Sequence, residues 1–133
     1  MPVLKPKSFS YDVSVDERGR IATDGTSVEV GDEWTADHLL LAAVVRCSLA
    51  SLAFHARRAS IDLTASGAAF GVVTKPEDEE RYRFVEIRAE IDARLDPLPE
   101  PDELAELLAR AERDCFVGSS LKTKPIYEWR VTG

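Results

Sequence analysis

Residues 39–54 read LLLAAVVRCSLASLAF, and they constrain the architecture more than any other stretch of the chain. They contain no glycine or proline, and Arg46 is their only charged residue. We therefore predict one long helix that begins after an N-cap at Thr35 and continues to about Ser60. Because this helix is apolar around most of its circumference, we expect it to be the central helix, buried on several sides.

Strands are predicted before and after this helix. Residues 8–15 alternate polar and apolar side chains, and residues 21–23 and 26–30 read as short strands around a turn. Residues 61–74 form another predicted strand. The clearest pattern lies at residues 85–95, where apolar and charged side chains alternate strictly, as in a sheet with one wet face.

A second helix and a closing strand complete the predicted elements. The helix follows Pro97, Pro99 and Pro101. Its apolar stripe consists of Leu104, Leu107, Leu108 and Ala111. Residues 127–131 read as the last strand. The order β-β-β-α-β-β-α-β lacks a regular βαβ alternation and contains no linker, so it indicates an α+β fold and a single domain over residues 1–133.

The composition limits the partners and the location that we expect. The 133 residues carry 17 Lys and Arg against 24 Asp and Glu, a formal net charge of −7. An acidic chain has no electrostatic reason to bind a phosphate backbone, so we expect no nucleic acid partner. The N-terminus lacks the apolar segment of a signal peptide, and the longest apolar run, Leu39–Val45, is too short to span a bilayer. We therefore expect a cytoplasmic protein with no membrane partner.

The two cysteines, Cys47 and Cys115, lie 68 residues apart, a spacing that matches no zinc motif. His38 lies about 180° around the helix from Cys47, and His55 lies about 12 Å along its axis, so neither forms a dyad with Cys47 within the helix. We interpret both histidines as surface residues, and we expect no metal and no cofactor. The cysteines are then either small buried hydrophobes or a redox pair.

Two segments resemble the signatures of the OsmC/Ohr family, the osmotically inducible and organic-hydroperoxide-resistance proteins. Residues 35–47, TADHLLLAAVVRC, resemble the Asn/Ser-Pro-Glu-x-Leu-Leu-x-Ala-Ala stretch that leads into a helical cysteine. Residues 111–121, AERDCFVGSSL, resemble the second signature, a Cys-Pro-Val-Ser-like segment followed by a last strand. The resemblance covers nearly the whole chain. It implies antiparallel sheets wrapped around a long central helix in an intertwined homodimer.

The same resemblance implies a thiol-dependent peroxidase for organic, fatty-acid type hydroperoxides. By position, Cys47 would be the peroxidatic residue and Cys115 the resolving one, joined by an intrachain disulfide. This chemistry requires a thiolate as nucleophile, and a second thiol that condenses with the sulfenic acid before it is over-oxidised. The implied reductant is an external dithiol of the lipoyl type.

In the family, an arginine beside the thiolate is held by the glutamate of the first signature. Asp37 occupies that position here, and the first hairpin turn offers Arg18 and Arg20, of which we favour Arg18. Arg46 points about 100° away from Cys47, which favours a salt bridge at an interface instead.

The chain departs from the signatures at three positions, where Ala36, Phe116 and Gly118 replace Pro, Pro and Ser. These departures leave a second function open: an OsmC-like dimer that is not a peroxidase, and that binds an apolar small molecule or senses thiol oxidation. Three aromatic residues are candidates to cover the pocket or the dimer surface, although packing in the core or at its rim is the role we expect for each. They are Trp34, Tyr127 and Trp129.

Overall fold

The computed structural model describes residues 7–133, and its contacts divide the chain into two compact units, residues 1–35 and 36–133. The first unit contains a small antiparallel sheet in the order β1-β2-β3. Its strands are β1 (Ser14–Val15), β2 (Ile21–Thr23) and β3 (Thr26–Val28). The strand predicted over residues 8–15 is therefore too long. Only its last two residues pair with β2, which is itself only three residues long.

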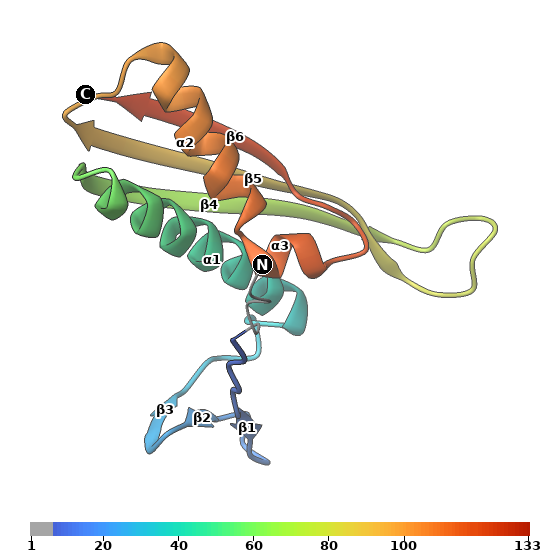
Figure 1. Cartoon of the computed structure of the whole chain (residues 1–133). Helices are drawn as coiled ribbons and strands as arrows, with labels where there is room; N and C mark the ends of the chain where they lie inside the picture. Colours follow the sequence, from blue (N-terminus) through green and yellow to red (C-terminus); the bar gives the residue numbers. More distant parts are fainter. Residues whose placement is uncertain (1–6) are drawn as a thin grey trace, which may run out of the picture. The chain divides into compact units, whose positions relative to one another are not determined.

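The second unit combines one three-stranded sheet with three helices (Figure 1). In chain order its elements are α1 (Ala36–Arg58), β4 (Asp62–Thr74), β5 (Arg83–Asp96), α2 (Pro101–Arg113), α3 (Phe116–Ser120) and β6 (Ile126–Thr132). β4 and β5 form a long antiparallel hairpin, and β6 pairs with the other edge of β5 in parallel. The helices α2 and α3 form the crossover that this parallel pairing requires. The mixed α+β architecture of the sequence prediction is confirmed.

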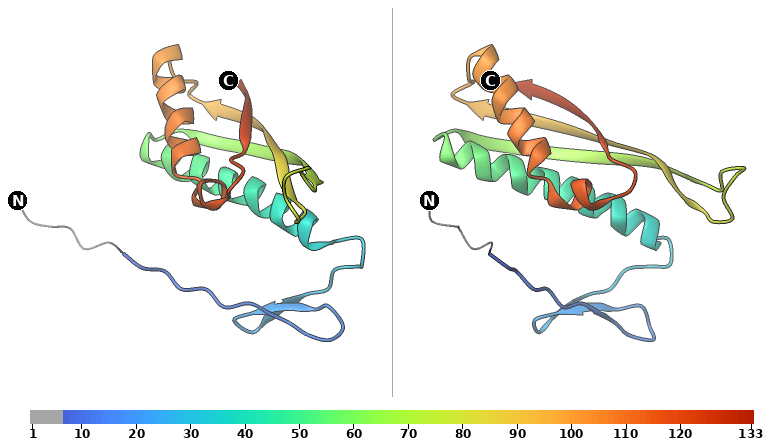
Figure 2. Two further views of the ribbon diagram at one scale, coloured as in Figure 1. Left: turned by 90° about the vertical axis from the view of Figure 1, so that its right-hand side faces the viewer. Right: turned by 45° about the vertical axis from the view of Figure 1, so that its right-hand side comes forward.

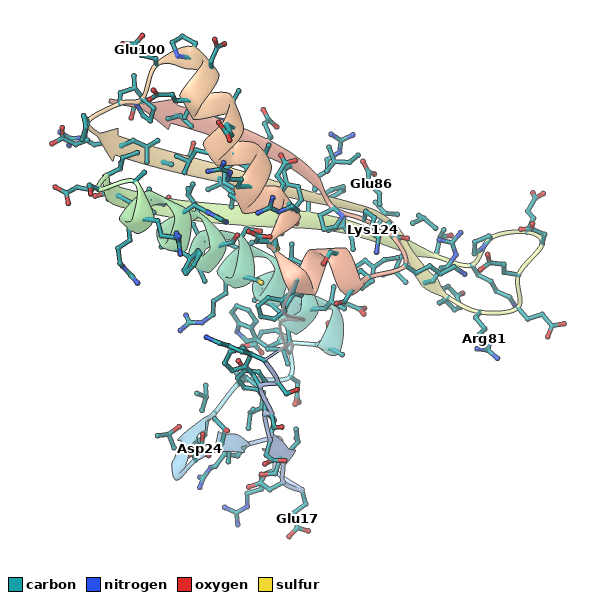
Figure 3. All side chains as sticks on the ribbon, viewed as in Figure 1. Glu17, Asp24, Arg81, Glu86, Glu100 and Lys124 are labelled. Atoms are coloured by element: carbon teal, nitrogen blue, oxygen red, sulfur yellow. The ribbon has the colours of Figure 1, made fainter. Side chains whose placement is uncertain are left out.

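The core lies between one face of this sheet and the helices α1 and α2 (Figure 2). β5 supplies Ile91, Ala93 and Leu95, which all point to the helical side because alternate residues of a strand share a face. Leu52 of α1 and Leu107 of α2 pack against them. The other face of the sheet carries charged side chains, of which Glu86 is labelled in Figure 3. The prediction of one wet face is thus confirmed.

The predicted alternation along β5 fails at one point. Val85 is exposed, although the pattern places it with the buried residues Ile87 and Ala89. The pairing register shifts between Val72 and Val73, and Val85 has no partner in the ladder. A bulge of this kind inserts one residue and reverses the alternation locally.

The helix α1 approaches β4 closely because two positions of the strand lack a side chain. A Cβ atom on Gly67 would lie 2.7 Å from Ile91 Cδ1 and 3.1 Å from Val45 Cγ1, and one on Gly71 would lie 3.1 Å from Leu41 Cδ2. Small residues therefore set the distance between the helix and the sheet.

The helix α1 is long and apolar enough to cross a membrane, by length and composition alone. The helix is thus longer than the uninterrupted apolar run Leu39–Val45, which by itself is too short to span a bilayer. However, the core helix of a soluble protein passes the same test, and one face of α1 packs on the sheet. Its buried residues are Val44, Ser48, Ser51, Leu52 and Ala56.

Candidate functional site

The structure brings Cys47 and Cys115 together. Cys47 lies in the middle of α1, and Cys115 lies in the junction between α2 and α3. One hydrogen bond, donated by the Cys47 S–H to the sulfur of Cys115, joins the two thiols, so the sulfur atoms are neighbours although 67 residues separate them in the chain. Both are free thiols. Cys47 is half-buried, whereas Cys115 is fully buried. Only Cys47 therefore offers its sulfur to a molecule in solution.

The junction that carries Cys115 is shaped by the end of α2. The backbone N–H of Asp114 donates to the carbonyl of Arg110, and this bond closes the last helical turn. Cys115 leaves the helix with φ −75° and ψ 83°, and its carbonyl accepts a bond from Ser119 N–H at 3.0 Å as the first turn of α3. Lys124 Nζ donates to the carbonyls of Ser119 and Leu121 at the other end of α3 (Figure 3). The short α3 is thus fixed at both ends.

A row of polar side chains on α1 holds this junction in place. Ser48 Oγ lies 3.4 Å from Cys115 Sγ, Ser51 Oγ donates to the carbonyl of Ala111 at 2.8 Å, and His55 Nε2 lies 2.7 Å from Asp114 Oδ2. Residues 48, 51 and 55 follow the helical repeat, so they share one face.

The interpretation of His55 as a surface residue is therefore wrong: its side chain is 11% exposed, because the end of α2 covers it. His38 is exposed, as predicted. Sequence analysis also missed Ser48 and Ser51, whose only signal was the spacing of polar residues within an apolar helix.

The surroundings of Cys115 favour its thiolate. Burial raises its pKa, but hydrogen bonds to Ser48, Tyr127, the Gly118 N–H and Cys47 outweigh burial and bring the pKa below its usual value. The Ser48 hydroxyl donates to the Val44 carbonyl at 2.7 Å, so in the neutral pair it accepts the Cys115 S–H. It can turn toward the sulfur when Cys115 is ionised.

The surroundings of Cys47 have the opposite effect. Burial and the neighbouring Cys115 raise the pKa of Cys47, and the backbone N–H groups of Val117 and Phe116 only partly oppose this. None of these influences is a cation. When the coupled pair loses its first proton, the charge therefore rests on Cys115 and the remaining proton on Cys47.

Three predicted site residues are not part of this cluster. Asp37 lies elsewhere in the second unit, and Arg18 and Arg20 lie in the first unit. Asp37 is exposed in the first turn of α1, about 15 Å of helical rise before Cys47, so a third side chain would have to link them. Arg20 Nη2 is paired with Glu29 at 2.5 Å. The exposed guanidinium of Arg18 makes no ion pair with any residue that the structure describes.

Tyr127 and Trp129 both belong to the surroundings of the thiols. The Tyr127 hydroxyl bonds to Cys115, and its ring stacks on Trp129 with 5.9 Å between ring centroids. Trp129 Nε1 donates to Glu112 Oε1 at 2.7 Å. Trp129 also packs against the core, as expected, whereas the contact of Tyr127 with a sulfur was not predicted.

A hollow in the second unit lies away from the cysteines, and the described residues hold no candidate metal site. A hollow of about 620 Å³ lies between the end of α1 and α2, where His55, Arg58 and Leu107 are among the lining residues, and neither cysteine borders it. Residues 7–133 contain no group of three or more His, Cys, Asp or Glu side chains that could hold a metal ion.

Comparisons with known proteins agree with the geometry. A family model described as OsmC-like protein matches residues 29–130. An OsmC-like protein of unknown function from Vibrio cholerae has a similar structure, with 13% identity, a TM-score of 0.68, and coverage of 83% of this chain and 82% of that one. An OsmC-like protein from Mycoplasma pneumoniae gives 13% identity, a TM-score of 0.65, and coverage of 95% and 98%.

The organic hydroperoxide resistance protein OhrB of Bacillus subtilis is similar as well. It gives 14% identity, a TM-score of 0.59, and coverage of 93% of this chain and 98% of its own. No curated protein matches the sequence.

Proposed function

Because the chain belongs to the family of OsmC-like proteins, we propose that it is a thiol-dependent peroxidase that reduces organic hydroperoxides. The observation that carries this proposal is the pair of neighbouring thiols, one half-buried and one fully buried. An accessible thiol can meet a peroxide, and a buried thiol beside it can capture the oxidised sulfur without competing for substrate. Solved structures with this fold include proteins named for organic hydroperoxide resistance.

In the proposed reaction Cys47 is the peroxidatic residue and Cys115 the resolving one. The Cys47 thiolate attacks one oxygen of ROOH, the O–O bond breaks, and the alkoxide takes a proton to leave as ROH. The resulting sulfenic acid of Cys47 reacts with the Cys115 thiol, which forms a disulfide and releases water. An external dithiol of the lipoyl type then reduces this disulfide, and is itself oxidised to a disulfide.

Activation of Cys47 requires a cation, because its surroundings in the second unit raise its pKa. We propose that Arg18 supplies this cation and that Asp37 holds it. Arg18 makes no ion pair among the described residues, whereas Arg20 is paired with Glu29. Arg18 could belong to the same chain or to the second chain of a homodimer.

A second function is favoured by one observation. The pKa of Cys47 is raised, as expected of a thiol that is not a nucleophile at neutral pH. A dimer that binds an apolar small molecule, or that senses oxidants slowly through the thiol pair, would have this property.

The deciding experiment mixes the reduced protein with one equivalent of cumene hydroperoxide and counts free thiols over time. The peroxidase is expected to lose two thiols within seconds and to form a Cys47–Cys115 disulfide. The Cys47→Ser variant should lose none, and Cys115→Ser should lose one and stop at the sulfenic acid, which only a second equivalent of hydroperoxide over-oxidises. Persistence of both thiols for minutes at neutral pH would contradict the peroxidase and favour the second function.

The role of Arg18 is tested by two matched variants in the same assay. Arg18→Gln should slow thiol loss by about tenfold for each unit by which the pKa of Cys47 rises without the cation. Arg20→Gln removes the same charge from the same turn and should react as the wild type does. Equal rates for Arg18→Gln and the wild type would show that the cation comes from elsewhere.

A further inference from the structure

The hydroxyl of Tyr127 lies against the sulfur of Cys115, although Tyr127 comes from β6 and Cys115 from the crossover before it. A hydrogen bond joins the two groups, and Ser48 is within hydrogen-bonding reach of both. Burial, and then the neighbouring Cys115, raise the pKa of the Tyr127 phenol well above its usual value. The phenol therefore keeps its proton and acts as a donor to the sulfur.

Gly118 makes room for this contact. A Cβ atom at position 118 would overlap the Tyr127 hydroxyl and would lie 3.2 Å from Pro125 Cγ and 3.4 Å from Cys115 Sγ. Gly118, which replaces the serine of the family signature, thus leaves the space that the Tyr127 hydroxyl occupies. The Gly118 N–H is itself a donor to Cys115.

Two donors therefore contact Cys115 Sγ, the Tyr127 hydroxyl and the Gly118 N–H, and the Ser48 hydroxyl becomes a third when it turns from the Val44 carbonyl to the ionised sulfur. We call this group the Cys115 cradle. The stacking of Tyr127 on Trp129, which is fixed by Glu112, limits the movement of the phenol ring. Hydrogen bonds to an anion are about twice as strong as those to a neutral group, so such donors favour the ionised sulfur.

We propose that the Cys115 cradle, with Tyr127 as a further catalytic residue, makes Cys115 the leaving thiolate when a dithiol reduces the Cys47–Cys115 disulfide. This inference rests on the proposed function. One thiolate of the reductant attacks Cys47 Sγ, a mixed disulfide with Cys47 forms, and the Cys47–Cys115 bond breaks. The bonding electron pair leaves on Cys115 Sγ, where the cradle donors bind it.

The second thiol of the reductant, once deprotonated, then displaces Cys47. The reductant becomes a cyclic disulfide after giving up two electrons, and both cysteines take up protons to return to thiols.

The burial of the two sulfur atoms points to the same direction of attack. Cys115 is fully buried, so an external thiolate reaches only Cys47. Exchange is faster when the leaving thiol has the lower pKa, and that thiol is Cys115. Accessibility and leaving-group stability thus both favour attack of the reductant on Cys47 over attack on Cys115.

The test follows reduction of a disulfide that is prepared with diamide, so that it does not depend on hydroperoxide chemistry. Dihydrolipoamide is added, and the return of free thiols is followed after acid quench. Tyr127→Phe should slow the reduction by about three- to tenfold, because the leaving thiolate loses one donor. Tyr82→Phe removes the same hydroxyl from an exposed ring and should behave as the wild type.

Gly118→Ala provides a second variant that keeps the phenol but displaces it. A hollow of about 390 Å³ bordered by Gly118, Pro125 and Tyr127 gives the ring space to move, so we expect this variant to fold. Its reduction should slow as in Tyr127→Phe. Thiolate absorbance at 240 nm in a Cys47→Ser background should show the pKa of Cys115 rising by about 0.5 to 1 when Tyr127→Phe is added, a change that loss of packing alone does not predict.

A mass map of the acid-trapped mixed disulfide with 2-mercaptoethanol should place the adduct on Cys47. An adduct on Cys115, no disulfide after diamide, or reduction rates of Tyr127→Phe and Gly118→Ala within twofold of the wild type would each overturn the cradle proposal. If the disulfide forms with diamide but not with cumene hydroperoxide, the peroxidase proposal fails while the cradle can still be measured.

Discussion

At the scale of single residues, Cys47 and Cys115 differ only in their surroundings. The donors of the Cys115 cradle outweigh burial and lower the pKa of Cys115, whereas burial is the largest influence on Cys47 and outweighs the Val117 N–H, so that the pKa of Cys47 is raised.

The pKa of Asp114, which follows α2 directly, is also determined by neighbouring side chains. Hydrogen bonds from Arg113 and then from His55 lower the pKa of Asp114 to about 2, although partial burial opposes this.

The pH dependence of stability should report the Asp114 interactions. Because the folded pKa lies below the unfolded value of about 3.9, the carboxylate stabilises the fold above about pH 4, and this contribution disappears as the pH falls toward 2. The side chain is 41% exposed, so we expect less than about 1 kcal/mol. Urea unfolding of wild type and Asp114→Asn should show a gap that is constant above about pH 4.5 and closes toward pH 2.

The control for this measurement is Asp78→Asn, which removes the same charge from an exposed turn between β4 and β5. A gap for Asp114→Asn that stays the same from pH 2 to pH 7 would contradict the assignment of the stabilisation to the ionised carboxylate.

At the scale of elements, the close packing of α1 on β4 positions Cys47. Position 67 has no side chain, and Val45 of the helix lies directly above it. Six and ten residues further along α1, Ser51 and His55 bind the end of α2. The helix thus has one region that contacts the sheet through backbone and another that holds the crossover, and the thiols meet between them.

Enlarging Gly67 should therefore destabilise the domain. We expect Gly67→Val to lower the free energy of unfolding by about 1–3 kcal/mol, because Ile91 and Val45 must move away from the new methyl groups. Ala68→Val adds similar bulk on the exposed face of the same strand and should change it by no more than about 0.5 kcal/mol. Denaturant titration measures both, and equal stabilities would show that the helix does not contact β4 at this position.

The sequence alone predicted most of these elements, because a local period specifies each of them. α1, β4, β5 and β6 lie within a few residues of their predicted bounds. α3 was missed because five residues are too few to show a helical period. Tyr127 could not be assigned to the thiols, because only the parallel pairing of β5 and β6 brings it there. Pairings between distant segments leave no local pattern in a sequence.

At the scale of the whole molecule, the outward face of α1 carries exposed apolar side chains beside two arginines, Arg46 and Arg57. Ala43 and Ala50 are exposed one heptad apart, and Phe54 is 51% exposed beyond them. Exposed apolar side chains with charged residues at their rim are typical of a protein interface. This face supports the proposed homodimer, in which a second copy would cover α1.

Sedimentation tests this proposal. At micromolar concentration we expect the wild type to show twice the 14.7 kDa of one chain. Ala50→Glu places a charge on the outward face of α1 and should shift the protein toward the monomer. Arg94→Glu changes a charge on the wet face of β5 and should leave the mass unchanged. A wild type that sediments as a single chain would contradict the homodimer.

The parallel crossover between β5 and β6 also has a consequence for the order of folding. The hairpin of β4 and β5 joins segments that are close in the chain, and such contacts form early. The strand β6 must return across the whole length of α2 and α3 before it can pair, so its loop closure carries a larger entropic cost. We therefore expect the sulfur of Cys115 to gain the Tyr127 hydroxyl in one of the last steps. A newly made chain would then hold two ordinary thiols, and only the completed fold would make them differ.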